Sequence, residues 1–253
     1  MSEQIKVRFA TYNVGDYSGD GVKGGSDESR KAFTELFKKV GADLWALQED
    51  VKFFSPETEE SAFDAIYSSV HKNYERNYTG NYNGKAFLSR FELKDVHPIK
   101  YTGEMKYRHP WYLTGKVEIE GREITLICLH FDWSDQVVRA EEIRQMLQYA
   151  QEQKYCIIMG DFNPEDYVDD GKKVSTRLFY KEELARFEEI GFECANAGRF
   201  GIFDTIVHPG SVISPCPFDN ILVTSNIHIV AADRAYEPWM NDHAPVWADL
   251  VID

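Results

Sequence analysis

Short apolar runs that end in a polar or ionisable residue are the feature that most constrains this chain. The run Cys156–Met159 is long enough for a buried strand, and after Gly160 it delivers Asp161 and Asn163 two residues apart. Because alternate residues of an extended backbone point the same way, this carboxylate and this carboxamide emerge side by side. Taken alone, the pattern is also typical of any strand that leaves a core and meets polar turn residues.

The arrangement recurs, and six apolar runs carry such a residue at one end. In chain order these residues are Asn13, Glu49, His130, Asp161 with Asn163, Asp219, and Asp242 with His243. The first four runs carry the residue at their C-terminal end and the last two at their N-terminal end. If the late strands run antiparallel to the early ones, all of these groups meet at one edge of the sheet structure.

That edge would gather carboxylates that repel one another unless they are paired, and a hard divalent cation resolves the repulsion. Mg²⁺, with Mn²⁺ as a substitute, fits better than zinc because no thiolate or tight histidine pair is present, and Ca²⁺ is favoured less. A cation among acids, amides and histidines suits phosphoester hydrolysis. Glycoside hydrolysis would explain neither histidine, and a serine hydrolase would need Gly-x-Ser-x-Gly, which is absent.

Hydrophobic periodicity predicts alternating helices and strands. The predicted helices cover 26–40, about 58–70, 135–153 and 181–190. The predicted strands are 5–13, 44–47, 85–90, 113–120, 123–129, 156–159, 221–224, 227–231 and 246–252, with a hairpin turn at Gly121-Arg122. We expect 74–84 to be a loop and 194–216 to be irregular. Late strands clustered in pairs with interspersed helices suggest an α+β or α/β layered sandwich.

The 253 residues show no repeat, low-complexity tract or linker, so we expect one domain over 1–253. No run approaches the ~18 apolar residues of a membrane span, and the N-terminus lacks the pattern of a signal peptide. Four scattered cysteines are too few for a disulfide scaffold. These features predict a cytoplasmic protein, which we expect to be a monomer.

The formal net charge of −14 argues against a groove that grips a nucleic-acid duplex by its phosphates. Nucleic acid nevertheless stays open as a partner, because a bound divalent cation changes the field at a site. The charge pattern therefore favours a small or lipid-derived phosphoester as substrate over nucleic acid.

The order of the motifs from about Phe9 to Leu250 resembles the endonuclease/exonuclease/phosphatase superfamily of deoxyribonuclease-like, metal-dependent phosphohydrolases. The matching motifs are Thr11-Tyr12-Asn13-Val14, Leu47-Gln48-Glu49, Ala86-Phe87-Leu88-Ser89-Arg90, Leu129-His130, Gly160-Asp161-Phe162-Asn163, Asp219 before a strand, and Asp242-His243-Ala244-Pro245. The resemblance implies an α/β fold, a four-layer αββα sandwich of two packed mixed sheets flanked by helices.

The resemblance also implies roles for the metal ligands. Glu49 would be the main Mg²⁺ ligand, helped by Asn13 and Asp242. His130 is similar to the histidine that deoxyribonuclease-like and phosphatase members carry and AP endonucleases lack. The acid that would partner His130 is not identifiable from the sequence.

Four residues would act on the phosphoester by the same resemblance. Asp161 would activate or orient the attacking water, and Asn163 would bind phosphate. His243, held by Asp219, would contact the scissile phosphate. Asn241, where many members have serine before the Asp-His pair, is a departure that we expect to be mild.

Trp133 and Trp239 flank the catalytic positions and could stack a base or a sugar, or could equally be core or loop anchors. We predict a Mg²⁺-dependent phosphodiesterase or phosphatase that uses in-line attack of a water positioned by Asp161. A deoxyribonuclease-like endo- or exonuclease is the first alternative, and a catalytically inactive binding module is the second.

Overall fold

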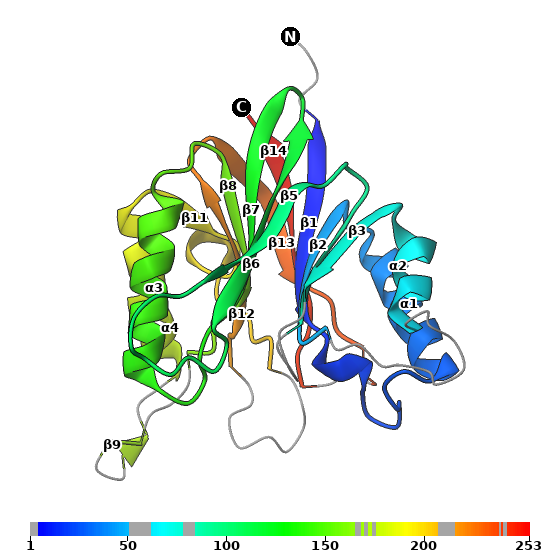
Figure 1. Cartoon of the computed structure of the whole chain (residues 1–253), viewed down its shortest axis with the longest axis horizontal. Helices are drawn as coiled ribbons and strands as arrows, with labels where there is room; N and C mark the ends of the chain where they lie inside the picture. Colours follow the sequence, from blue (N-terminus) through cyan, green and yellow to red (C-terminus); the bar gives the residue numbers. More distant parts are fainter. Residues whose placement is uncertain are drawn as a thin grey trace.

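The chain folds into two six-stranded sheets packed face to face, with helices on the outer face of each sheet (Figure 1). This computed structural model describes residues 5–50, 62–77, 84–164, 168–169, 172–173, 176–206, 216–237, 239 and 242–253. Both sheets are mixed, so the predicted four-layer α/β sandwich is confirmed.

The first sheet has the strand order β13-β14-β1-β2-β4-β3. Its strands are β1 (Lys6–Asn13), β2 (Leu44–Gln48), β3 (Asn73–Asn77), β4 (Lys85–Ser89), β13 (Ile227–Arg234) and β14 (Val246–Ile252). Only β1 and β2 run parallel to each other among its paired neighbours.

The second sheet has the order β11-β12-β8-β7-β6-β5. Its strands are β5 (Lys94–Lys100), β6 (Trp111–Ile119), β7 (Arg122–His130), β8 (Cys156–Asp161), β11 (Phe192–Cys194) and β12 (Asp219–Thr224). Here β7 and β8 are the parallel pair, and the other neighbours are antiparallel. A separate two-stranded piece consists of β9 (Val168–Asp169) and β10 (Lys172–Lys173).

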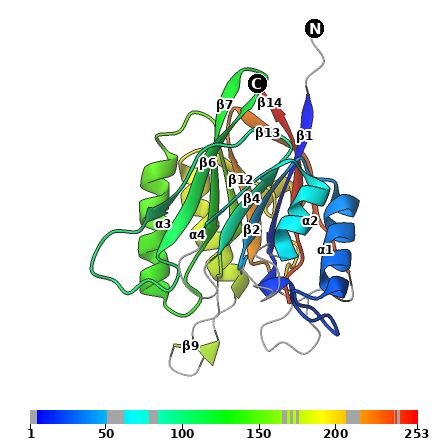
Figure 2. The same cartoon turned by 45° about the vertical axis from the view of Figure 1, so that its right-hand side comes forward.

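Two helices cover each sheet, as the two views in Figures 1 and 2 show. α1 (Asp27–Val40) and α2 (Ala62–Val70) lie over the first sheet, and α3 (Gln136–Ala150) and α4 (Thr176–Glu189) lie over the second. Two short 3-10 helices are η1 (Gly15–Tyr17) and η2 (Gly198–Phe200). No helix in the described part of the chain is long and apolar enough to cross a membrane.

α1 begins and ends where its capping residues predict. The Ser26 side chain accepts a hydrogen bond from the Ser29 backbone N–H, which satisfies one of the unpaired donors of the first turn. Gly41 takes the left-handed conformation (φ 63°) that commonly ends a helix. Both ends agree with the helix predicted over 26–40.

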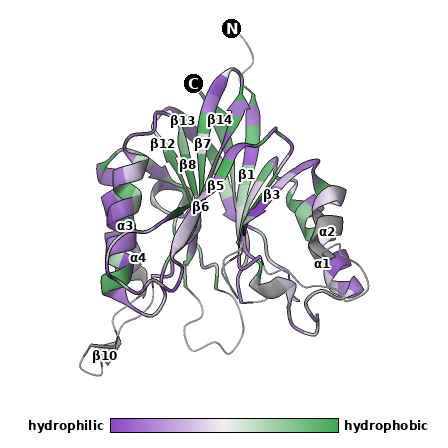
Figure 3. Ribbon diagram, in the orientation of Figure 1, coloured by the Kyte–Doolittle hydropathy of each residue, from purple (hydrophilic) through white to green (hydrophobic). Residues whose placement is uncertain are grey.

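The core lies in three apolar layers, because alternate residues of each strand face opposite sides of its sheet. Phe9 of β1, Cys128 of β7 and Met159 of β8 belong to the layer between the two sheets. Trp45 of β2 faces the other way and packs on Phe37 of α1, with ring centroids 4.6 Å apart. Figure 3 shows the hydrophobic residues along the central strands.

The strand directions bring one set of strand ends together. β1, β2, β7 and β8 end at the edge of the sandwich that lies opposite the two chain termini, and β12 and β14 begin there (Figure 1). The late strands β12 and β14 are antiparallel to β8 and β1, which is the condition that convergence at one edge required. His130, Asp161 and Asp219 occupy adjacent register positions across β7, β8 and β12.

Several predicted boundaries were wrong. The expected loop over 74–84 contains most of β3, while residues 78–83 lie outside the described part of the chain. β5 was not predicted, because its sequence is polar and includes Pro98, which edge strands tolerate. α4 begins at Thr176 rather than at Lys181. The first residues of the helix predicted over 58–70 also lie outside the described part, which begins at Ala62.

The hairpin between β6 and β7 turns one residue earlier than predicted. Ile119 pairs with Arg122, so the turn residues are Glu120 and Gly121. Both have positive φ, 52° and 75°, as the type I′ turn of a two-residue hairpin requires. Glycine at the second position supplies that conformation without strain, and Gly121 is the residue that made the turn recognisable.

Gly160 allows β8 to pass close to β7 just before Asp161. Its φ is +155°, and a Cβ there would lie 2.2 Å from the Leu129 carbonyl oxygen. A backbone oxygen cannot move away as the end of a flexible side chain can, so only glycine fits.

We predict that Gly160→Ala destabilises the fold by about 3 kcal/mol or more, because overpacking against backbone adds to conformational strain. Gly121→Ala is the matched control, since Gly121 also has positive φ but a Cβ there would meet nothing within 4 Å. It should cost about 1 kcal/mol. Denaturant unfolding measures both, and equal losses would contradict the close approach at Gly160.

Candidate active site

The candidate site continues the apolar layer between the sheets. Asn13, His130, Asp161 and Asp219 have the same parity as the apolar residues that face this layer from β1, β7, β8 and β12. All four are nearly inaccessible to solvent. The polar residues at the ends of the inward-facing rows therefore meet above the core.

Glu49 reaches the site because its backbone departs from the extended conformation of a strand. Leu44 and Ala46 of β2 face the layer between the sheets, so a regular strand would point Gln48 inward and Glu49 outward. Glu49 instead has φ 53°, which is uncommon for a residue other than glycine. Its side chain is 28% exposed, so it lies where the site opens to solvent.

Asp161 is the centre of the site. Its Oδ2 accepts a hydrogen bond from Asn13 Nδ2 at 3.1 Å, and the same amide nitrogen donates to Glu49 Oε1 at 3.2 Å. Oδ2 also lies 3.5 Å from His130 Nε2 and 3.6 Å from His243 Nε2. One buried carboxylate oxygen therefore faces an amide and two imidazoles.

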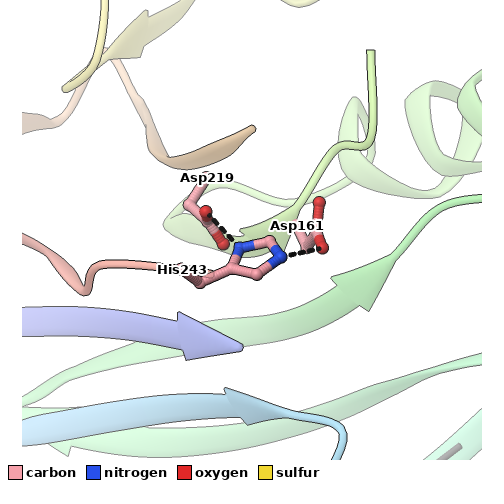
Figure 4. A group of neighbouring side chains, drawn as sticks. All are labelled: Asp161, Asp219 and His243. Carbon is pink, nitrogen blue, oxygen red and sulfur yellow. Dashed lines mark hydrogen bonds and ion pairs between the residues drawn. The ribbon is translucent and has the colours of Figure 1, made fainter. Parts of the chain in front are cut away.

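His243 lies between two carboxylates (Figure 4). Its Nδ1 is 2.8 Å from Asp219 Oδ2, and its Nε2 faces Asp161. Burial alone would lower the pKa of His243, but the charges of Asp219 and Asp161 outweigh it and raise that pKa well above its ordinary value. The geometry therefore favours an imidazolium that is paired with Asp219.

Burial shifts the pKa values of Asp161 and His130 in the directions that favour their neutral forms. It raises the pKa of Asp161, and the charge of His243 opposes that shift only in part. Burial also lowers the pKa of His130 well below its ordinary value, and the nearby His109 and Lys85 lower it further. The two histidines thus differ in charge, because only His243 has a buried carboxylate hydrogen-bonded to its Nδ1.

His130 has acids only beside its Nε2, where Asp161 lies at 3.5 Å and Glu49 at 3.9 Å, and a ring packs against its face. The His109 ring stacks on it, with centroids 3.8 Å apart and an interplanar angle of 19°. Within the described part of the chain, His130 Nδ1 has no hydrogen-bond partner. No local pattern singles out His109, since a histidine before a proline is also typical of an ordinary loop.

Asn163 and Asp242 occupy different parts of the site. Asn163 is buried beside Asp161, where its N–H donates to Asp161 Oδ1 at 2.9 Å and its Nδ2 donates to the Phe131 carbonyl at 3.2 Å. Asp242 is exposed, and its charge raises the pKa of neighbouring His243. The structure therefore brings Asn163 into the central cluster and leaves Asp242 at its margin.

The two candidate substrate-binding tryptophans lie in different surroundings. Trp133 is 43% exposed, and the Arg108 guanidinium stacks over its ring at 4.4 Å. Trp239 is partly buried and packs against Phe33 of α1, with ring centroids 5.1 Å apart. This packing supports the anchor interpretation for Trp239, whereas Trp133 presents a surface to solvent.

The oxygen-rich side of the site fits a hard divalent cation. Asp161, Asp219 and His243 have ligand-type atoms within 4.8 Å of one another, but the Asp219–His243 bond already uses two of them. On the other side, the Asn13 amide bridges the carboxylates of Glu49 and Asp161, and His130 Nε2 lies within 3.9 Å of both. Rotation of that amide would turn its oxygen toward a cation there and give up the bond from Gly15 N.

The chain belongs to the Endonuclease/Exonuclease/phosphatase family, whose sequence model matches residues 10–233. Members of this family are generally divalent-metal-dependent phosphoesterases and nucleases, which act on phosphoester or nucleic-acid substrates. No protein with a curated description matches the chain.

Solved structures share the fold at low sequence identity. An endonuclease/exonuclease/phosphatase from Beutenbergia cavernae is 16% identical with a TM-score of 0.73, over 99% of this chain and 72% of that one. A family protein from Bacteroides vulgatus is 18% identical (TM-score 0.68; 99% and 100% covered). TDP2 from D. rerio, solved with a single-strand DNA product, is 15% identical (TM-score 0.67; 97% and 98% covered).

We predict that Asp219→Asn lowers the pKa of His243 in the metal-free protein, because burial then acts with less opposing charge. NMR titration of the imidazole measures the change. Asp249→Asn is the control, since it removes a buried carboxylate that pairs with Arg8 on β1 instead. An unchanged His243 pKa in Asp219→Asn would contradict the pairing.

Proposed function

We propose that the chain is a Mg²⁺-dependent hydrolase that cleaves small or lipid-derived phosphoesters. The observation that carries the proposal is the convergence of Asn13, His130 and His243 on one oxygen of buried Asp161. A buried carboxylate is expensive to desolvate, so its retention here supports a role in the chemistry of the site. Perturbed carboxylates and histidines of this kind cluster at catalytic sites.

Glu49 and Asn13 would hold the cation, with Asp242 at the margin of its surroundings. Bound there, Mg²⁺ supplies the neutralisation of negative charge that builds on the phosphoryl oxygens. Glu49 suits this role because it combines a carboxylate with the solvent access that a cation needs to enter. Mn²⁺ has similar ligand preferences and should substitute.

Asp161 would orient the attacking water and take its proton. Asn13 donates to Oδ2 and the Asn163 N–H donates to Oδ1, so both oxygens are fixed in place. A base that is already oriented does not have to reorganise during the reaction, and this lowers the activation barrier. In-line attack then requires the phosphoryl group on the open side of Asp161.

His243 and Asn163 would hold the phosphoryl group. His243 Nε2 lies 3.6 Å from Asp161 Oδ2, which is longer than a direct hydrogen bond, and its N–H would donate to a phosphoryl oxygen placed between them. Asp219 fixes the proton on Nδ1 and stabilises the imidazolium. Neutral His130 would donate from Nε2 on the opposite flank.

We predict Mg²⁺-dependent cleavage of bis(p-nitrophenyl) phosphate that EDTA abolishes and added Mg²⁺ restores. Glu49→Gln and Asp161→Asn should each lower kcat by about 100-fold or more, since each removes a charged group that acts in the transition state. Glu118→Gln is the control, because this carboxylate is exposed on β6 and bonds only to surface Lys94 among the described contacts. Turnover that survives both site substitutions would contradict the proposal.

A nuclease is the second candidate, and the exposed Trp133 with its stacked Arg108 favours it. An aromatic ring beside a cation can stack a base and contact a phosphate. A parallel assay of single-strand oligonucleotides, phospholipids and sugar phosphates separates the candidates. Oligonucleotide cleavage that falls steeply with salt would select the nuclease, and ligand binding without turnover would select the inactive module.

A further inference from the structure

Asp50 is a buried carboxylate one residue after Glu49, and it takes no part in the proposed chemistry. Arg76 Nε donates to its Oδ2 at 2.6 Å, and Arg76 Nη2 and the Tyr17 hydroxyl each donate to its Oδ1 at 3.0 Å. The Asp50 side chain is inaccessible to solvent, and that of Arg76 is 9% exposed. The two residues therefore form a bidentate ion pair that the fold encloses.

The chain carries one extra residue, Glu49, where β2 ends. Gln48 is the last residue of β2 to pair with β4, opposite Lys85. Gly84, the residue before Lys85, accepts a hydrogen bond from the Asp50 N–H at 3.1 Å, so two residues follow Gln48 where the partner has one. This count is that of a β-bulge. The positive φ of Glu49 (53°) is a conformation that persists in a residue other than glycine only when surrounding contacts enforce it.

The extra residue places Glu49 and Asp50 on opposite sides of the first sheet. Glu49 lies in the site between the sheets, whereas Asp50 bonds Tyr17, which packs in the apolar layer under α1 and α2. Arg76 of β3 pairs with Ala86 of β4, and Ala86 belongs to the same helix-covered layer. A regular strand would exchange the sides of the two carboxylates. Holding Asp50 on the helix side therefore keeps Glu49 on the side of the site.

The surroundings of the ion pair can hold this turn. A bidentate arginine–carboxylate pair has a fixed geometry, and movement of Asp50 would leave the Arg76 guanidinium buried without that partner. The guanidinium also lies over the Tyr67 ring, 5.5 Å from its centroid, and the Tyr67 hydroxyl contacts that of Tyr17. Asp50 is thus connected to β3, η1 and α2, three elements that are separate in the chain.

We propose that Asp50 and Arg76 are positioning residues of the phosphoester-hydrolase site, whose ion pair holds the turn that directs the Glu49 carboxylate to a divalent cation. The inference rests on the proposed function, since Glu49 is the residue that would hold the cation. The pair itself touches neither cation nor substrate, because it lies on the helix side of the first sheet. Loss of the pair therefore acts through Glu49 and weakens cation binding.

The test is Arg76→Lys, which keeps the positive charge and removes the two parallel bonds of the guanidinium. In the metal-free variant, the Asp50 N–H that bonds Gly84 should exchange with solvent about 10-fold faster, because the turn opens more often. NMR hydrogen exchange measures this rate. The Kd for Mn²⁺, measured by calorimetry, should rise about 10- to 100-fold, because a group that orients a metal ligand is lost.

Arg8→Lys is the matched control, because Arg8 makes a bidentate pair with the buried carboxylate of Asp249 in the same sheet. It should lower the Tm, as Arg76→Lys should, but change neither the exchange of the Asp50 N–H nor the Kd for Mn²⁺. An unchanged exchange rate or an unchanged Kd in Arg76→Lys would overturn the inference. An equal rise of the Kd in Arg8→Lys would overturn it as well.

Asp50→Asn is a second variant for the case that Arg76→Lys does not fold, since it keeps the size of the side chain and an acceptor for the Tyr17 hydroxyl. The same loss of protection at residue 50 and the same rise of the Kd are expected. Neither readout needs turnover. A parent protein that binds Mn²⁺ and hydrolyses none of the phosphoesters would therefore contradict the proposed function and leave this comparison decisive.

Discussion

The buried carboxylate of Asp161 determines how the other polar side chains of the candidate site are arranged. A carboxylate enclosed between two sheets loses the solvation of water and must find compensation in the protein. Here the compensation comes from the Asn13 amide, the Asn163 backbone N–H and the charge of His243. These groups come from different elements, so the Asp161 carboxylate contacts side chains from both sheets.

The two sheets bring these groups together through the same strand arrangement. Each sheet has one parallel pair at its centre, β1–β2 and β7–β8, and the strands of these pairs end at the same edge. Antiparallel β12 and β14 begin at that edge and bring Asp219 and His243. The apolar layer fixes the register, because a slip of one residue would turn every inward side chain outward.

The surroundings of His243 and His130 shift the pKa values of these two imidazoles in opposite directions. Asp219 pairs with Nδ1 of His243 and raises the pKa of that imidazole, while burial and the nearby His109 and Lys85 lower the pKa of His130. Two histidines at one carboxylate can thus perform different tasks, one as a cation and one as a neutral donor. Burial strengthens both effects because little solvent screens them.

The sequence predicted the parts of the site that follow from local patterns. Asp161 was recognisable because an apolar run, a glycine and a polar pair occur within eight residues, and Asp219 because a strand follows it directly. Strand direction, and with it convergence at one edge, could be stated only as a condition until the two sheets were known. The family resemblance correctly implied the four-layer fold.

The residues that the sequence did not reveal depend on contacts between distant segments. Lys85 begins an apolar run and looks like an ordinary residue at the end of a strand, since nothing local says that both sheets will enclose it. His109 gains its role from a ring stack with a residue 21 positions away. β5 was missed because an edge strand needs no apolar alternation to pair with its neighbour.

Titration of the protein with Mn²⁺ can show whether these side chains share a cation, because a bound paramagnetic ion broadens the NMR signals of nearby groups. If the acids and amides converge on a cation, the imidazole signals of His130 and His243 should disappear at the lowest Mn²⁺ concentrations. His97 and His228 are exposed and lie on the edge strands β5 and β13. Their signals should persist. Broadening that affects all four equally, or spares His130 and His243, would contradict the account.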